Sequence, residues 1–405
     1  MIIKSNSIIL ATDSSPAFVE AQSGLPYKTK LYPLSFVNNL TFDIPNTRAR
    51  MKQLSSQDFA YDSLQFAPVI NLSFDYTSSV EFLNEAFFGI IFGANEFNQS
   101  VLKSTNDFST NLYFILSDDH PFDLIYKIKQ VGNLNNLNCW SFGNCRVKSY
   151  SMRMAAGSLP STSISFEALN TQMQTISNNL INCPAINTSV GNQNNIANVK
   201  VDNSDFLRAL DTLNTSISGQ PILPTFDSKF TLSNTNIQSP SIVISPHSDS
   251  AITAINLSVE FERENSYGFE SNYIYDSKIK YPLLGTVDIE AVAFGLYSGT
   301  NSLTGIMTTE SGYDLAINSS GTINSKTITL KNSKLQSHSY SIDYASNLTA
   351  KFSFSFQANE NNGLVCQWTQ NINPSSGQLF TKDLLRIISS DGKEIRTSDN
   401  YYFSS

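Results

Sequence analysis

The chain has 405 residues, of which 40% are hydrophobic and 11% aromatic, and its formal net charge is −8. A single hydrophobic core seldom grows beyond about 250 residues, so two or three domains are expected. The negative charge excludes nucleic-acid binding through a basic face that neutralises phosphates, although it allows contact with DNA without adhesion. Only 15% of residues are charged. That paucity fits a surface hidden against neighbours, and equally an AT-rich genome that favours Asn codons.

The sequence contains no segment typical of export or of a membrane span. The apolar run at residues 1–15 is broken by polar residues, whereas a signal peptide needs about 7 to 15 continuous apolar residues. No window approaches the roughly 18 apolar residues of a membrane helix. We therefore expect assembly in a cytoplasm and no membrane partner.

The cysteines and histidines predict no metal site, cofactor or catalytic residue. Cys139 and Cys145 lie in CWSFGNC and are expected to be thiols, although they could bridge in an oxidising medium. Zinc would require CxxC pairs or nearby histidines. His120, His247 and His338 have no Ser, Cys or carboxylate motif beside them. We expect no enzyme, while paired carboxylates for glycoside cleavage depend on spacing that a sequence does not give.

Two segments of the chain recur in the same order, which predicts an internal duplication. YDSLQFAP at 61–68 matches YDSKIKYP at 275–282, a displacement of 214 residues. Residues 149–168 match residues 339–358 with eight identities in twenty, a displacement of 190. The first copy then carries about 24 extra residues, which we place in the Asn-rich stretch after His120.

The duplication divides the chain into five predicted parts. They are an N-terminal arm at 1–32, copy one at 33–170, a polar Asn-rich connection at 171–249, copy two at 250–360 and a C-terminal extension at 361–405. Within the connection, the apolar spacing over 206–213 behind a cap at Asp205 predicts a short helix, and short strands are expected beside it.

Alternation of apolar and polar residues predicts that both copies are mainly β. In copy one, LTFDI at 40–44 and INLSFDY at 70–76 alternate, and a helix over 78–93 is expected to cover the sheet. In copy two, LSVEFE at 257–262 and TVDIEA at 286–291 alternate in the same way. Keeping the same parity in both copies requires one extra residue near Gly285, read as a β-bulge. Later strands are expected in NLYFILS, SYSMRM, TSISFEAL, YDLAINS, KTITLKN, SYSIDYA and AKFSFSF.

The polar faces of these four alternating strands carry carboxylates as their only ionisable groups. The residues are Asp43, Asp75, Glu260, Glu262, Asp288 and Glu290. A solvated outer face usually mixes both signs of charge. The pattern therefore favours a strand face that is kept acidic for a function. The alternative is an ordinary solvated outer face of a β-sandwich.

These patterns resemble the tail tube protein family of long-tailed bacteriophages. Residues 259–291 look like the family's long hairpin, and residues 149–169 look like its late strand pair, with both features present in each copy. The resemblance implies two tandem tail-tube-like β-sandwich domains, each with a long strand-loop-strand hairpin and an accessory helix. In that family six domains form a ring whose hairpins close a β-barrel around a channel. Two domains per chain then imply a homotrimeric ring with pseudo-sixfold symmetry.

The resemblance also implies a place in the virion and a set of partners. Rings of the family stack into a tube, so the first partner is the protein itself. A tape measure protein and a tail terminator or baseplate protein are the others. The six carboxylates would line the lumen and repel phosphate, so that DNA passes without specific binding.

The two hairpin excursions differ in charge, which predicts a role in ring stacking. The first carries Arg48, Arg50 and Lys52. The second carries Glu264 and Glu270 against Arg263. Opposite charges on alternating loops would fix the rotation of one ring on the next.

Two other functions fit the same residues. A tail completion or baseplate adaptor protein of the same fold would form one ring instead of a tube. A β-sandwich host-binding adhesin would need export and exposed aromatic residues on its strand faces.

Overall fold

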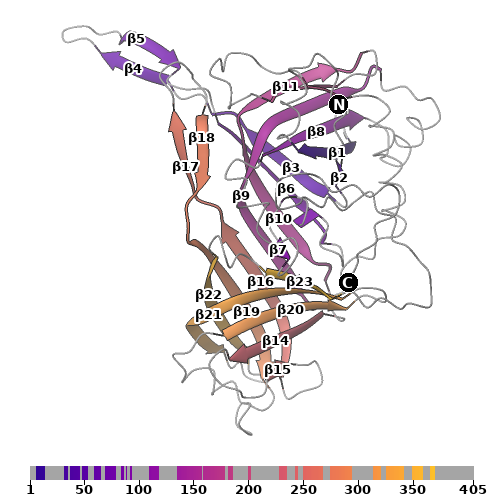
Figure 1. The fold of residues 1–405 in the computed structure, drawn as a ribbon, viewed down its shortest axis with the longest axis vertical. Helices are drawn as coiled ribbons and strands as arrows, with labels where there is room; N and C mark the ends of the chain where they lie inside the picture. The colour runs from indigo at the N-terminus through magenta and orange to yellow at the C-terminus, as the bar shows by residue number, and fades with distance from the viewer. Residues whose placement is uncertain are drawn as a thin grey trace.

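The computed structural model shows a mainly β protein built from a large, largely antiparallel sheet system (Figure 1). It describes residues 6–13, 32–34, 37–45, 48–52, 59–64, 69–78, 84–85, 88, 92–93, 109–117, 135–156, 158–177, 181–185, 199–201, 228–234, 242–244, 250–267, 274–293, 313–320, 325–341, 349–358 and 365–369. The predicted β class is therefore confirmed.

A central sheet runs continuously through both halves of the chain. Its order is β3 (Val37–Asp43), β6 (Ile70–Tyr76), β10 (Ser161–Ala168), β9 (Asn138–Ala155), β16 (Ser250–Glu260), β19 (Leu283–Ala293), β22 (Thr349–Ala358) and β21 (Ser325–Ser341). All seven pairings are antiparallel. The first four strands come from the first half of the chain and the last four from the second half.

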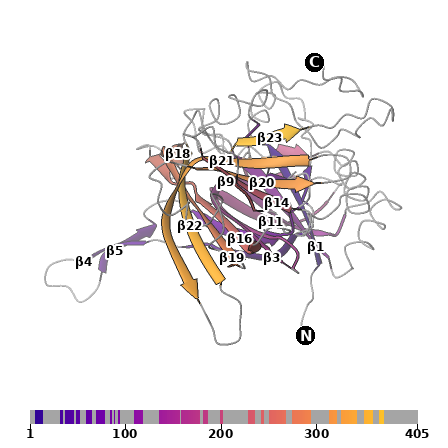
Figure 2. The ribbon, with the colours of Figure 1, turned by 90° about the horizontal axis from the view of Figure 1, so that it is seen from below.

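A second layer packs behind each half of the central sheet. In the first half it contains β2 (Tyr32–Pro33), β1 (Asn6–Asp13), β8 (Thr110–Ser117), the start of β9 and β11 (Asn170–Thr175). In the second half it contains β15 (Ile242–Ile244), β14 (Ser228–Asn234), β20 (Tyr313–Ser320), the start of β21, β23 (Val365–Thr369) and β7 (Phe92–Gly93). The long strands β9 and β21 take part in both layers, and Figure 2 shows β21 curving from β20 and β23 to β22. One hydrophobic core lies between the layers.

Two hairpin arms extend beyond the central sheet (Figure 1). One arm pairs β4 (Arg48–Lys52) with β5 (Phe59–Leu64), and it continues the β3–β6 hairpin. The other pairs β17 (Arg263–Tyr267) with β18 (Ile274–Ile279), and it continues the β16–β19 hairpin. A separate small pairing joins β12 (Ile181–Cys183) to β13 (Val199–Val201).

The strand registers of two hairpins in the first half repeat residue for residue in the second half. A displacement of 215 positions, from Arg48 to Arg263, carries β4 and β5 onto β17 and β18 with identical bounds. A displacement of 188 positions, from Lys148 to Gln336, carries the β9–β10 pairing onto the β21–β22 pairing. Each of these pairings has one extra residue at the same place, Lys148 in β9 and Gln336 in β21. The two halves therefore share one strand arrangement.

The long strands bend between layers at equivalent asparagines. Asn144 has φ 53° and Asn332, 188 positions later, has φ 52°. This left-handed region is strained for most residues and is tolerated best by Gly and Asn. The backbone N–H of Asn144 is also held by the side-chain oxygen of Asn111 at 3.0 Å. Both copies thus use the same irregularity to pass one strand from the central sheet to the second layer.

The predicted bulge near Gly285 is wrong. β19 pairs with β16 and β22 in continuous register through Gly285, and the shift in the β16–β19 pairing lies between Ile252 and Ala254. Matching Tyr61 to Tyr275 gave a displacement of 214, one less than the backbone shows. With 215 positions, Leu72 falls on Val287 and the alternation is kept without an inserted residue.

Some predicted parts carry strands that join their neighbours. β1 lies in the predicted N-terminal arm and pairs with β8, while β14 lies in the predicted connection and pairs with β20. The boundaries of the five parts stay a prediction. Within the predicted helix at 78–93, the Phe88 N–H donates to the Asn84 carbonyl at 3.0 Å, which is one helical turn, and residues 92–93 form β7. The rest of this helix and the helix at 206–213 lie outside the described residues.

Replacing Gly285 by alanine is expected to destabilise the protein. A Cβ at this position would overlap the ring of Phe356, which lies over the glycine and is 3% exposed. Overpacking of this kind costs about 1–3 kcal/mol, measurable as a lower urea midpoint at unchanged slope. Leu284→Ala is the control, because Leu284 is 64% exposed and its change should stay within about 0.5 kcal/mol. Equal midpoints for the two variants would contradict the expectation.

Candidate functional site

The face of the central sheet that points away from the second layer is polar. Successive strand residues alternate between the buried core and this face, as in the burial pattern of β6. The face includes Thr41, Asp43, Ser73, Asp75, Lys148, Ser149, Ser151, Arg153, Ser163, Ser165, Glu167, Asn256, Ser258, Glu260, Thr286, Asp288, Glu290, Lys334, Ser337, Ser339, Lys351, Ser353 and Ser355. We call it the polar face; it spans both halves of the chain.

The structure brings five of the six predicted carboxylates onto the polar face. They are Asp43, Asp75, Glu260, Asp288 and Glu290. Glu262 is exposed but lies beyond the end of β16, just before the arm begins. Asp75 accepts a hydrogen bond from the Asn39 amide at 3.1 Å.

The polar face also carries cations that escaped the sequence analysis. Lys148 and Arg153 come from β9, Lys334 comes from β21, where it lies opposite Ser355, and Lys351 comes from β22. Lys351 Nζ lies 2.6 Å from Glu290, and Lys148 Nζ lies 3.1 Å from Glu167. The same alternation in SYSMRM and AKFSFSF would have found Arg153 and Lys351, had all strands been analysed together, whereas Lys148 is the extra residue of the bulge in β9. Six carboxylates, with Glu167 included, still outnumber these cations.

The two halves of the sheet meet at the β9–β16 junction. Tyr150 lies opposite Val259, and Met152 lies opposite Leu257. All four side chains are at most 2% exposed. Beyond the last strand pair the Phe261 N–H donates to the Lys148 carbonyl at 2.8 Å. The junction is therefore buried as fully as the interior of either half.

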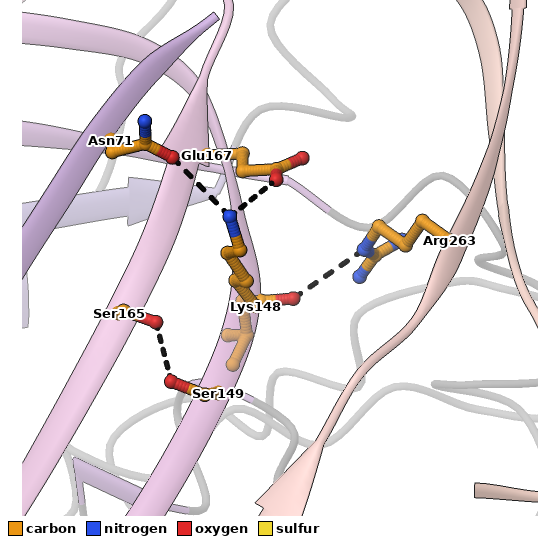
Figure 3. A network of polar contacts seen from close by, with 7 residues as sticks. Asn71, Lys148, Ser149, Ser165, Glu167 and Arg263 are labelled. Carbon is orange, nitrogen blue, oxygen red and sulfur yellow. Dashed lines mark hydrogen bonds and ion pairs between the residues drawn. The ribbon is translucent and has the colours of Figure 1, made fainter.

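A polar network surrounds the bulge in β9 beside this junction (Figure 3). Lys148 reaches Glu167 and, at 3.4 Å, the side-chain oxygen of Asn71. Arg263, at the start of the second arm, donates from Nε to the Val147 carbonyl at 3.4 Å. In the second half, the equivalent bulge residue Gln336 donates to Ser355 at 2.7 Å. The same cross-strand contact is thus charged in one half and neutral in the other.

The two outer edges of the central sheet are open. Among the described residues, β3 pairs only with β6, and residues 334–341 of β21 pair only with β22. On these edges Ile44 is 37% exposed and Tyr340 is 38% exposed. Their equivalents at the β9–β16 junction are Val259 and Met152, each 1% exposed. Positions that are buried inside the chain are therefore uncovered at its two ends.

The second arm packs against the first half of the chain. Ile274 of β18 is 3% exposed and clusters with Leu169 and Val69. Figure 1 shows β17 and β18 beside the strands of the first half. The equivalent of Val69 in the second half is Leu284, which is 64% exposed. This second position has no counterpart of Ile274 over it within the described residues.

The predicted stacking residues lie on the two arms. Arg48, Arg50 and Lys52 belong to β4. Glu264 is exposed on β17, whereas Arg263 is partly buried at the β9 bulge. Glu270 lies outside the described residues. A role of these residues in stacking stays a prediction.

Other predicted sites are placed as follows. Cys139 and Cys145 are free and buried, as expected. His338 is exposed on β21 with its ring against Tyr340, while His120 and His247 lie outside the described ranges. No cluster of three metal-ligating side chains occurs in the part of the chain that the structure describes. No helix in that part is long and apolar enough to cross a membrane.

A buried carboxyl sits beneath the first half of the sheet. Glu85 accepts hydrogen bonds from Ser78 Oγ at 3.0 Å and from the Tyr150 hydroxyl at 3.5 Å. Burial raises the pKa of Glu85 above its ordinary value of 4.5, although these hydrogen bonds oppose the shift. Burial, followed by the charge of Glu85, raises the pKa of Tyr150. Burial therefore favours the protonated carboxyl, whereas the hydrogen bonds from Ser78 and Tyr150 favour the ionised form.

Replacing Glu85 by glutamine is expected to change how stability depends on pH. A raised folded pKa means that stability is complete below the unfolded pKa and is lost as the pH rises through the folded pKa. The free energy of unfolding of Glu85→Gln minus that of the wild type should therefore increase as the pH rises above 4.5. The increase is at most about 1.4 kcal/mol per pH unit. Urea unfolding at several pH values measures the difference.

The matched control for this titration is Glu260→Gln, since Glu260 is exposed. Its free energy of unfolding should stay within about 0.5 kcal/mol of that of the wild type, as is usual for an exposed substitution. A constant difference between Glu85→Gln and the wild type at every pH would show that Glu85 does not titrate with a raised pKa.

Comparison with known proteins finds weak structural likeness to chains of solved structures. No protein-family model and no curated protein sequence matches the chain. Among solved structures, a chain in the "Cryo-EM structure of the anti-feeding prophage (AFP) baseplate, 6-fold symmetrised" is similar at 10% sequence identity, with a TM-score of 0.24. The match covers 44% of this chain and 97% of that one.

Proposed function

We propose that this protein is a structural subunit of a phage tail, and specifically of the tube through which DNA leaves the virion. Three copies close the central sheet into a ring, and the rings stack into a hollow tube. The proposed partners are further copies of the chain, a tape measure protein and a terminator or baseplate protein. No catalytic role or cofactor is proposed.

One observation carries the proposal: the two open edges of the sheet, β21 and β3, are equivalent to the two strands that pair at the junction, β9 and β16. Applying the displacements of 188 and 215 positions to the β9–β16 register sets β21 of one copy beside β3 of the next. Ser339 then faces Asp43, Tyr340 faces Phe42 and His338 faces Ile44. Such pairing removes exposed strand edges, which otherwise invite uncontrolled association. We call this intersubunit pairing the seam.

Closing the seam leaves the polar face as the lining of a channel. The opposite face of the central sheet is already covered by the second layer and the shared core. A closed sheet has only an inside and an outside. An excess of carboxylates over cations on the inside repels phosphate, so DNA meets no adhesive site in transit.

The number of subunits follows from the resemblance to tail tube proteins. Rings of that family contain six domains, and each chain here repeats one strand arrangement twice. Three chains thus supply six repeats. The charged contact of Lys148 with Glu167 alternates with the neutral contact of Gln336 with Ser355 around such a ring.

A tail completion or baseplate adaptor protein is the second candidate function, because a single ring needs the same seam. An adhesin fits less well, since the polar face has carboxylates and hydroxyls where a binding face usually has aromatic residues. Electron microscopy of the purified protein in negative stain distinguishes the candidates. Hollow tubes are the expected result, isolated rings would favour the adaptor, and monomers alone would contradict both ring functions.

A further inference from the structure

We infer that the β4–β5 arm of one subunit clamps the neighbouring subunit at Leu284, across the seam. This inference rests on the proposed function, because it requires a ring. The clamp has two contacts: Phe59 of the arm covers Leu284 and Gln357 of the neighbour, and Arg48 donates to the neighbour's Leu335 carbonyl. The partner is a second copy of this chain.

The template for the clamp is the β17–β18 arm. This arm leaves the central sheet at the end of β16 and is anchored on the first half of the same chain at two points. Ile274 is buried against Leu169 and Val69. Arg263 Nε donates to the Val147 carbonyl at 3.4 Å (Figure 3). One contact is apolar and the other is a charge-assisted hydrogen bond to the bulged strand.

The chemistry of the arm is kept at the equivalent positions of the first arm. A displacement of 215 positions takes Ile274 back to Phe59 and Arg263 back to Arg48. An apolar residue again stands where the arm turns back, and an arginine again stands where it begins. Among the described residues, β3 forms an open edge of the sheet, so no neighbouring half of the same chain lies where the first arm could pack against it.

The receiving surface is present on the second half. Val69 corresponds to Leu284 by 215 positions, and Leu169 and Val147 correspond to Gln357 and Leu335 by 188 positions. Leu284 lies directly opposite Gln357 in the β19–β22 register. A single exposed leucine is ordinary on a protein surface. Leu284, however, is 64% exposed at a position whose counterpart is covered by an arm.

The inference gives Arg48 a different role from ring stacking. Arg263 Nε donates to the backbone carbonyl of Val147, which belongs to the sheet beside the junction. Arg48 at the seam would do the same, and would fix the register of β21 on β3. Among the three cations of β4, only Arg50 and Lys52 are then left to contact the next ring.

Cross-linking at the clamp tests the inference directly. In Phe59→Cys with Leu284→Cys, a short bismaleimide should join neighbouring subunits and yield covalent trimers on a denaturing gel. Ile274→Cys with Val69→Cys is the positive control, because it should cross-link within one chain and leave the mass monomeric. Phe59→Cys with Leu159→Cys is the negative control, since Leu159 is 63% exposed but lies on the β9–β10 turn. The wild type sets the background from native cysteines.

A second variant measures what the clamp contributes. Leu284→Asp should raise the concentration needed for half-assembly of rings at least about tenfold, whereas Leu159→Asp should not. Asp43→Cys with Ser339→Cys reports the seam independently. If rings form and this pair cross-links, but the Phe59 and Leu284 pair yields only monomers, the clamp is wrong and the proposed function stands. If the wild type forms no rings, both are wrong.

Discussion

A single carboxylate placed on each open edge of the central sheet is expected to abolish ring formation and leave the subunit folded. In Ile44→Asp with Tyr340→Asp, the new charges replace side chains that are 37% and 38% exposed in the subunit. At the seam the same positions take the place of Val259 and Met152, which are 1% exposed. An unpaired charge buried in this way costs several kcal/mol, and a ring contains three seams.

Sedimentation velocity and negative-stain images measure the loss of rings, and urea unfolding measures the fold. We expect monomers with an unfolding midpoint close to that of the wild type, because exposed substitutions usually change stability by less than about 0.5 kcal/mol. Met173→Asp is the matched control, since Met173 is 57% exposed on β11 and away from both edges. Rings formed normally by the double edge variant would rule out the β21–β3 seam.

Reversing the charge of the polar face is expected to turn an inert channel into one that holds DNA. Glu260→Lys with Asp288→Lys changes two exposed residues of adjacent strands, β16 and β19. Three chains would supply six lysines to each ring. Six phosphate contacts would make binding fall roughly a thousandfold between 50 and 200 mM salt. Retention of labelled linear duplex DNA by the tubes measures the effect.

Two controls place the new charges inside the tube. Glu260→Gln with Asp288→Asn removes the same carboxylates without adding cations, and it should bind no more DNA than the wild type. Covalently closed circular DNA cannot thread a channel, so the lysine variant should hold linear DNA and leave circles free. Equal retention of linear and circular DNA would mean that the polar face lies on the outside.

Sequence reasoning found the β class, the alternating strands and five residues of the polar face, because strand alternation is a local property that each segment shows on its own. Lys148, Arg153 and Lys351 were missed, since which strands lie side by side is decided by pairing across long sequence separations. Identity between repeats was also a poor guide to register. Tyr61 and Tyr275 are the same residue type, yet the strand register makes Tyr61 equivalent to Asp276.

The arms show the same limit more sharply. The charges of Arg48 and Arg263 were visible in the sequence, and both were read as loop residues facing another ring. The contact of Arg263 with the Val147 carbonyl shows that an arm can fold back along its own sheet. Its partner is a backbone oxygen at a bulge, a feature that no side-chain pattern marks.

The β9–β16 junction has a kinetic consequence. Because it forms within one polypeptide, its strands meet at the effective concentration of a tethered pair and lose no translational freedom when they dock. Six separate domains would have to make six bimolecular junctions, whereas three double-length chains make three. The rate of ring closure should then depend on a lower power of the protein concentration. Fewer types of incomplete ring should also form. In the proposed ring, joining two domains in one chain would make assembly less sensitive to the concentration of the protein.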